Sequence, residues 1–225
     1  MMNLQRGIYA IVDGDRLGFA TRTDRRPPVN LLRGYAEVAA DAGAVAVQIR
    51  LKYLPLGHPT RLTVLNAVCR ALGTRIPIIV DDDVTAAVDG HVGLHLGQED
   101  GDPRQARAKL DANALLGWST HTLAQVIAAQ ALPVQYLGFG PVRATSGKQA
   151  HDPVTGLDAL RQAVAASRLP IVAIGGLTLA DVPQVHDAGA HAMAVIGAWL
   201  GPAGQPHDLA TARVHLAECV AAWHR

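Results

Sequence analysis

Short apolar segments alternate with longer amphipathic segments along the whole chain. The apolar segments are rich in Val, Ile and Ala and do not alternate strictly with polar residues, which is typical of strands buried on both faces of a parallel sheet. The predicted strands span 7–13, 44–50, 76–82, 92–97, 114–120, 134–142, 170–176 and 190–197.

The segments between these strands have the period of amphipathic helices. Asn30 is a candidate N-cap and Gly43 a C-terminal stop of the first helix. The predicted helices span 30–43, 59–73, 84–90, 102–110, 121–132, 156–167, 179–189 and 208–223. Parallel strands need such crossover helices, so the pattern predicts an α/β fold, a single (β/α)8 TIM barrel over residues 1–225. A doubly wound open sheet is the main alternative, but Gly14-Asp15-Arg16 after the first strand is not the GxGxxG that it favours.

Composition and charge narrow the function classes. The chain is 49% hydrophobic and 17% charged, with a net charge of +1, which gives no electrostatic reason to expect a nucleic acid or a membrane as partner. Cys69 and Cys219 share no metal-binding spacing and are expected to be reduced thiols. No apolar run resembles a leader or a membrane span, so we expect a cytoplasmic protein. Whether the protein forms a homo-oligomer stays open.

The predicted strands end in polar residues, which a barrel would bring together at one mouth. Gln48, Arg50 and Lys52 alternate and share one side of the second strand. Inside a barrel this places two cations near the axis, which is costly unless they bind an anion; on an edge strand they would be a solvated face.

The ends of the third and fourth strands carry carboxylates. Asp81-Asp82-Asp83 alone suits a turn or an N-cap, but together with Asp100 it resembles a site for a hard cation such as Mg²⁺. Mg²⁺ usually takes one or two carboxylates and completes its coordination with water and substrate phosphate. His95 lies inside an apolar strand and is expected to be a packed, hydrogen-bonded core histidine.

Glycines follow the seventh and eighth strands at Gly175, Gly176 and Gly197. Loops at this place in a barrel often bind phosphate through backbone N–H groups, and glycine lets an anion approach the backbone closely. The alternative is that these are turn glycines only. The sequence thus predicts two anion-binding ends, one for a monophosphate and one, with a metal, for a diphosphate.

These motifs together resemble the thiamine phosphate synthase family over nearly the whole chain. The family's Q-[LIV]-R-x-K is found at 48–52, HLGQ-x-D at 95–100, G-x-S-T-H at 117–121, GFGP at 138–141 and IGG at 174–176. The resemblance implies a transferase that joins hydroxymethylpyrimidine diphosphate to a thiazole phosphate, carboxylated or not, with Mg²⁺ as cofactor.

The resemblance also implies roles for individual residues. It assigns Asp82 and Asp100 to Mg²⁺ and places Ser119 beside the pyrimidine. It assigns the pyrimidine diphosphate to Gln48, Arg50, Lys52, Asp81 and Lys148, and the thiazole phosphate to Thr145, Ser146, Gly147, Gly175, Gly176, Ile196 and Gly197.

Four positions depart from the family pattern. Asp81 stands where the family usually has Asn and Asp83 where it usually has a basic residue, Gly147 replaces a hydroxyl residue, and Gly197 replaces a serine. These changes bear on substrate affinity more than on the class of reaction. Two other functions stay open: a thiazole tautomerase, in which His121 would be the general base, and a barrel that binds phosphorylated ligands without turnover.

Overall fold

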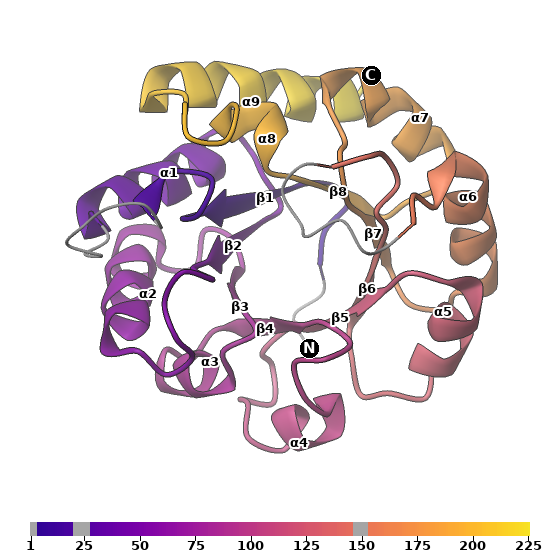
Figure 1. Ribbon diagram of the computed structural model, residues 1–225, viewed down its shortest axis with the longest axis horizontal. Coiled ribbons are helices and arrows are strands. Elements are labelled where there is room, and N and C mark those ends of the chain that lie inside the picture. The colour runs from indigo at the N-terminus through magenta and orange to yellow at the C-terminus, as the bar shows by residue number, and fades with distance from the viewer. Residues whose placement is uncertain (1–3, 20–27, 146–152) are drawn as a thin grey trace.

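The computed structural model describes residues 4–19, 28–145 and 153–225. Its strands pair in parallel, in chain order, and close into a barrel (Figure 1). The strands are β1 (Gly7–Asp13), β2 (Ala46–Arg50), β3 (Ile78–Asp81), β4 (Gly93–Leu96), β5 (Leu116–Thr120), β6 (Tyr136–Phe139), β7 (Ile171–Ala173) and β8 (Ala192–Val195). The predicted (β/α)8 barrel is confirmed.

Helices surround the barrel, as the amphipathic segments predict (Figure 1). They are α1 (Val29–Asp41), α2 (Pro59–Leu72), α3 (Val84–Asp89), α4 (Pro103–Arg107), α5 (Leu123–Ala129), α6 (Gly156–Ala166), α7 (Val182–Asp187), α8 (Gly197–Leu200) and α9 (Leu209–Trp223), with a 3₁₀ turn, η2 (Leu179–Asp181). No helix in the described ranges is long and apolar enough to cross a membrane.

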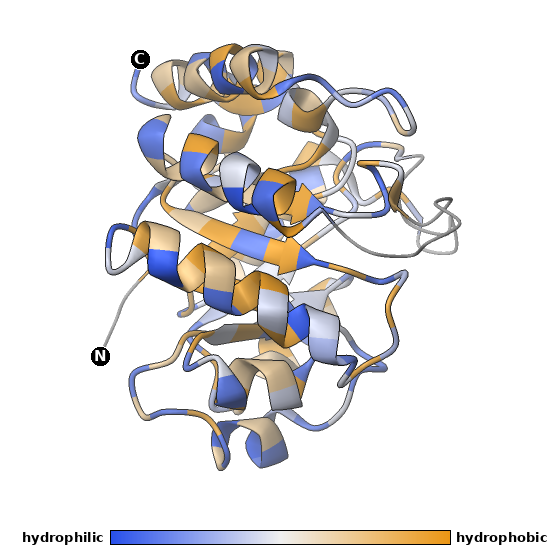
Figure 2. Ribbon diagram, turned by 90° about the vertical axis from the view of Figure 1, so that its left-hand side faces the viewer, coloured by the Kyte–Doolittle hydropathy of each residue, from blue (hydrophilic) through white to orange (hydrophobic). Residues whose placement is uncertain are grey.

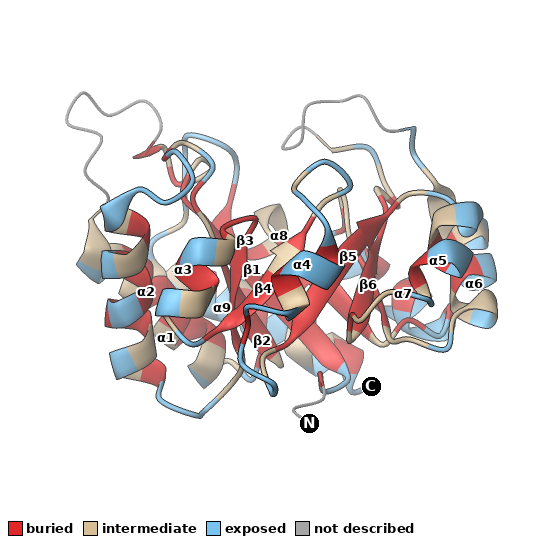
Figure 3. Cartoon of the chain, turned by 90° about the horizontal axis from the view of Figure 1, so that it is seen from below, coloured by how far each residue is buried: buried red, intermediate tan, exposed pale blue. Residues whose placement is uncertain are grey.

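The strands separate two apolar cores. The larger core lies between the strands and the helices, and the smaller core fills the inside of the barrel. Strand residues are buried on both sides, whereas the helices expose their outer faces (Figure 3). The helices accordingly mix hydrophilic and hydrophobic residues (Figure 2). Alternate residues of each strand point inward, so that Tyr9 and Ile11 of β1 belong to the inner core. The next inward residue, Asp13, is polar and lies toward the mouth.

The later strands end earlier than predicted. β6 ends at Phe139 and β7 at Ala173, so the residues predicted to finish these strands lie in loops. Gly175 and Gly176 have φ angles of 98° and 65°, which are outside the β region. Residue 197, predicted to end the last strand, begins α8 instead, and the buried Trp199 donates its indole N–H to the carbonyl of Val195.

The three aspartates at 81–83 were compatible with an N-cap or with a cation site, and Asp83 has the first of these roles. Its Oδ1 accepts a hydrogen bond from the backbone N–H of Ala86 and caps α3, at 3.0 Å. Its Oδ2 accepts from the backbone N–H of Gly57 and lies 3.5 Å from Nε of Arg61. Asp83 is therefore an N-cap, whereas Asp81 and Asp82 face the mouth of the barrel.

Candidate active site

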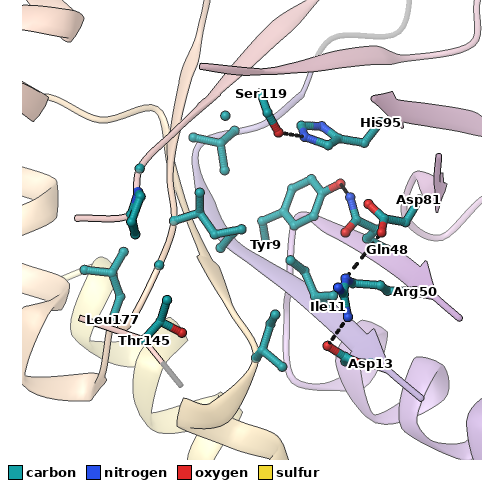
Figure 4. Close-up of a pocket in the computed structure, with 18 of the residues that line it drawn as sticks. Tyr9, Ile11, Asp13, Gln48, Arg50, Asp81, His95, Ser119, Thr145 and Leu177 are labelled. Carbon is teal, nitrogen blue, oxygen red and sulfur yellow. Dashed lines mark hydrogen bonds and ion pairs between the residues drawn. The ribbon is translucent and has the colours of Figure 1, made fainter. Parts of the chain in front are cut away.

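A cavity of about 550 Å³ opens at the carboxyl ends of the strands. It is of the size usual for small-molecule sites. Residues from the strand ends and from the loops that follow them line it, and those on one wall face those on the other (Figure 4). The described residues predicted for the site line this cavity: Gln48, Arg50, Lys52, Asp81, Asp82, Asp100, Ser119, His121, Thr145, Gly175, Gly176, Ile196 and Gly197. Ser146, Gly147 and Lys148 lie outside the described residues.

Arg50 lies among carboxylates at the mouth. Its Nη1 is 2.7 Å from Oδ2 of Asp13 and 3.5 Å from Oδ2 of Asp15, and its Nε is 3.3 Å from Oδ2 of Asp81 (Figure 4). Burial disfavours the charge, but these three carboxylates outweigh it and raise the pKa of Arg50. The sequence pattern predicts an external anion as the partner of Arg50, and it does not indicate Asp13 and Asp15. Their place at and just beyond the end of the first predicted strand was the available signal.

Lys52 lies between the two predicted metal ligands. Its ammonium contacts Oδ2 of Asp82 and is 3.9 Å from Oδ1 of Asp100. Burial opposes the charge, yet the hydrogen bond with Asp82 and the surrounding carboxylates raise the pKa of Lys52. Burial, then repulsion by Asp81, raises the pKa of Asp82 to about 7 despite Lys52. The two carboxylates therefore already share one cation supplied by the protein.

The local backbone fixes both aspartates. Asp82 has a φ of 62°, in the left-handed region where Asp is among the better tolerated residues, and its N–H donates to the carbonyl of His95. Asp100 closes a turn in which its Oδ2 accepts from the N–H of Gly97 at 2.9 Å. That turn explains how a buried strand delivers a carboxylate to the mouth: the strand ends at Leu96, and the next four residues fold back on themselves.

A chain of hydrogen bonds crosses the floor of the cavity. Nε2 of Gln48 donates to the hydroxyl of Tyr9 at 3.1 Å, and the hydroxyls of Tyr9 and Tyr136 are 3.1 Å apart. Nδ1 of His95 is 3.0 Å from the Tyr136 hydroxyl. Nε2 of His95 is 2.9 Å from Oγ of Ser119 (Figure 4). Burial raises the pKa of both tyrosines, so they remain neutral partners.

His95 is hydrogen-bonded, as predicted, but it is more than a core residue. Its ring lines the cavity and contacts Ser119, the residue expected to face the pyrimidine. Gly117 makes room for it, because a Cβ at position 117 would lie 2.4 Å from Nδ1 of His95 and 2.1 Å from Cζ of Tyr136. The isolated histidine in an apolar strand gave no sign of these partners, which come from β5 and β6.

We expect Tyr136→Phe to lower the free energy of unfolding by about 1–3 kcal/mol, because it leaves buried polar atoms of His95 and Tyr9 without this partner. Chemical denaturation measures the change. Tyr53→Phe is the control, since the Tyr53 hydroxyl is buried with no hydrogen-bond partner among the described residues. It should change stability by no more than about 0.5 kcal/mol. Equal effects of the two substitutions would show that the chain across the floor contributes nothing.

The far wall, at the ends of β7 and β8, is formed largely by glycine backbone. A Cβ on Gly175 would lie 2.4 Å from Cα of Pro141, and one on Gly176 would lie 2.2 Å from the carbonyl oxygen of Ala144. Close packing against the loop after β6 thus requires glycine at both positions. Because both also line the cavity, the turn role and the predicted phosphate role are compatible. Thr145 and Leu177 lie on this side, across from Arg50 (Figure 4).

His121 also lines the cavity. Its Nδ1 is 2.7 Å from the carbonyl oxygen of Gly140. A carbonyl only accepts, so Nδ1 carries the proton in the neutral ring and Nε2 is the basic nitrogen. Nε2 is therefore the nitrogen at which this histidine could act as a base, as the tautomerase alternative requires.

A family model and the sequence relatives below indicate the same family. Residues 21–199 match the family described as thiamine monophosphate synthase. A thiamine-phosphate synthase of Chlamydia caviae is 37% identical over 180 residues, covering 79% of this chain and 84% of that protein. The bifunctional thiamine biosynthesis protein ThiED of Geobacter sulfurreducens is 40% identical over 199 residues, covering 87% of this chain. This chain spans only 37% of that longer protein.

A solved structure agrees with the sequence relatives. The thiamine phosphate pyrophosphorylase from Pyrococcus furiosus superposes with a TM-score of 0.76 at 27% identity, covering 97% of this chain and 96% of that one.

Proposed function

Because the chain belongs to the thiamine monophosphate synthase family, we propose that it joins hydroxymethylpyrimidine diphosphate to a thiazole phosphate, giving thiamine phosphate and diphosphate. The observation that carries this proposal is one cavity with two unlike ends. Arg50 and Lys52 stand on one wall among carboxylates, and the glycine backbone after β7 and β8 forms the other. Such a cavity suits two phosphorylated substrates held face to face.

In the proposed reaction the bond between the pyrimidine methylene carbon and the diphosphate oxygen breaks first. The diphosphate leaves with the electron pair, and the thiazole nitrogen then attacks the methylene cation. Arg50 and Lys52, with Gln48, stabilise the leaving group, and Ser119 positions the pyrimidine ring beside it. This chemistry needs positioning and charge, not a covalent nucleophile.

We also propose that this wall binds Mg²⁺, and a count of its charges supports the proposal. The cavity-lining carboxylates of the described residues are Asp13, Asp15, Asp81, Asp82 and Asp100, against Arg50 and Lys52 on the same side. A diphosphate placed there would meet an excess of negative charge. Oxygen ligands at Asp82 and Asp100 fit a hard cation, which would take its remaining ligands from water and the diphosphate. When bound, Mg²⁺ would neutralise charge on the leaving diphosphate.

Asp81 has a defined place in this scheme. It stands where the family usually has Asn, and its extra charge is matched by Arg50 at 3.3 Å. We therefore expect Asp81 to hold the guanidinium of Arg50 rather than to contact the diphosphate. A cytoplasmic location, the absence of nucleic-acid and membrane partners, and a homo-oligomer stay predictions of the sequence.

The first test is diphosphate release by the purified chain. We expect release only with both substrates and Mg²⁺, with thiamine phosphate formed in equal amount, and loss of release in EDTA that excess Mg²⁺ restores. Assays with the thiazole and the carboxythiazole phosphate identify the accepted form. Isomerisation of the thiazole without diphosphate release would instead favour the tautomerase with His121 as base. Binding without either reaction would leave a non-catalytic binder.

A further inference from the structure

Arg16 extends from the loop after β1 to the end of β8, the neighbouring strand in the barrel. Its Nε donates to the carbonyl oxygen of Gly201 at 2.6 Å. Its backbone is fixed on both sides, since its N–H donates to Oδ1 of Asp13 and its carbonyl accepts from the N–H of Gly204. The side chain is half-buried and lines the cavity. Arg16 is therefore held in place at the end of β8, beside the backbone of Gly197.

Gly197 makes room for this guanidinium. A Cβ built on Gly197 would lie 2.5 Å from Nη2 of Arg16 and 2.9 Å from its Cζ. A side chain at position 197 and the present position of Arg16 thus exclude each other. Glycine at the start of α8 lets the cation lie directly against the backbone at the end of β8.

Arg16 differs from the two other cations that line the described part of the cavity. Arg50 is paired with three carboxylates and Lys52 contacts two. No carboxylate of the described residues lies within ion-pair distance of the Arg16 guanidinium, and the hydrogen bond to Gly201 uses only its Nε. Both terminal nitrogens keep donors in the planar arrangement that matches a phosphate group.

We propose that Arg16 binds the phosphate group of the thiazole substrate, as the charged ligand on a wall otherwise made of glycine backbone. The inference rests on the proposed function for the identity of that substrate. It assigns the monophosphate end a cation from the first loop, which neither the motifs nor the comparisons indicate. It also explains why position 197 is glycine, since any side chain there would overlap the guanidinium.

The test compares Arg16→Gln with the unchanged chain. Losing a charge-assisted contact should raise the KM for thiazole phosphate about 10- to 100-fold. The KM for the pyrimidine diphosphate should change by less than about threefold, because that substrate lies at the other wall. In calorimetry, affinity for thiazole phosphate should fall, while binding of the dephosphorylated thiazole alcohol should stay the same. Arg16→Lys, which keeps the charge, should lose less affinity than Arg16→Gln.

Arg6→Gln is the matched control. The Arg6 guanidinium also donates to a backbone carbonyl, that of Ala190, but at the opposite end of the barrel. This variant should leave both KM values unchanged. If Arg16 only held the loop after α8 in place, Arg16→Gln would weaken binding of the thiazole phosphate and of the thiazole alcohol alike. It would also raise the KM values of both substrates. That result would overturn the proposal.

Gly197→Ala tests the same contact independently, because it leaves Arg16 itself unchanged. The added Cβ should displace the guanidinium and weaken thiazole phosphate binding, but it should cost little more when Arg16 is already Gln. Additive effects in this double-mutant cycle would contradict the proposed coupling.

The outcomes separate this inference from the proposed function. Condensation that is insensitive to Arg16→Gln would overturn the inference alone. Binding of thiazole phosphate that depends on Arg16, without condensation, would support the inference and overturn the proposed reaction. A chain that does not bind thiazole phosphate would overturn both.

Discussion

Asp100→Asn lowers kcat/KM for thiamine phosphate formation by about 100-fold or more, in line with the loss of one preorganised charge-stabilising group from an active site. Asparagine still offers an oxygen to the N–H of Gly97, so the turn after β4 is retained. What the substitution removes is the negative charge beside Asp82 and Lys52. The Mg²⁺ concentration for half-maximal activity should rise with it. Steady-state rates across a Mg²⁺ titration measure both effects.

Glu99→Gln provides the matched control, because it removes one carboxylate from the same turn. Glu99 is exposed and does not line the cavity. Its activity and Mg²⁺ dependence should stay within about twofold of the parent, since exposed charges are screened and interact weakly. If the two variants behave alike, Asp100 is not a metal ligand and the role given to the turn is wrong.

Arg61→Ala has the largest expected effect on stability, a loss of about 3–5 kcal/mol in the free energy of unfolding. Arg61 is only 2% exposed and lies 3.5 Å from Asp83, which is equally buried. Its guanidinium also donates to the carbonyls of Leu51, Leu54 and Pro55. The substitution leaves a buried carboxylate and these carbonyls without their cation. Urea denaturation gives the change directly.

Two further variants show whether the buried charge is the cause. Arg70→Ala, at an exposed position of the same helix, should change stability by no more than about 0.5 kcal/mol. Asp83→Asn added to Arg61→Ala should recover part of the loss, because asparagine keeps an N-cap oxygen but removes the unpaired charge. No recovery would mean that the lost packing of Arg61, and not its ion pair, accounts for the instability.

The fold was predictable because it depends on a local and repeated signal. Each strand is a short apolar run and each helix an amphipathic one, and eight such pairs leave few alternatives to a barrel. The predicted strands were confirmed in number and order, whereas α8 is an additional helix and the predicted helix 179–189 is divided into η2 and α7. The boundaries failed where glycine and proline follow a strand. β6 ends before Gly140 and Pro141, and β7 ends before Gly175 and Gly176, whose positive φ angles are not visible in an apolar pattern.

The convergence of these residues on one cavity could be predicted from the sequence for the same reason. The alternation of Gln48, Arg50 and Lys52 fixes one side of a strand, and parallel strands bring their carboxyl ends to one mouth. Partners across strands were not accessible. Asp13 lies beside Arg50 because β1 pairs with β2 in a register where these two residues are opposite. His95 meets Ser119 and Tyr136 for a similar reason.

The sequence by itself determined the barrel, the family and the residue types at its mouth, because these depend on periodicity and on short motifs within single segments. Only the tertiary structure decided which charges compensate one another. It separated Asp83, a helix cap paired with Arg61, from its neighbours in the cavity. It also placed Arg16 against Gly197, 181 positions later in the chain. Electrostatic interactions act through space, so the order of residues along the chain does not reveal them.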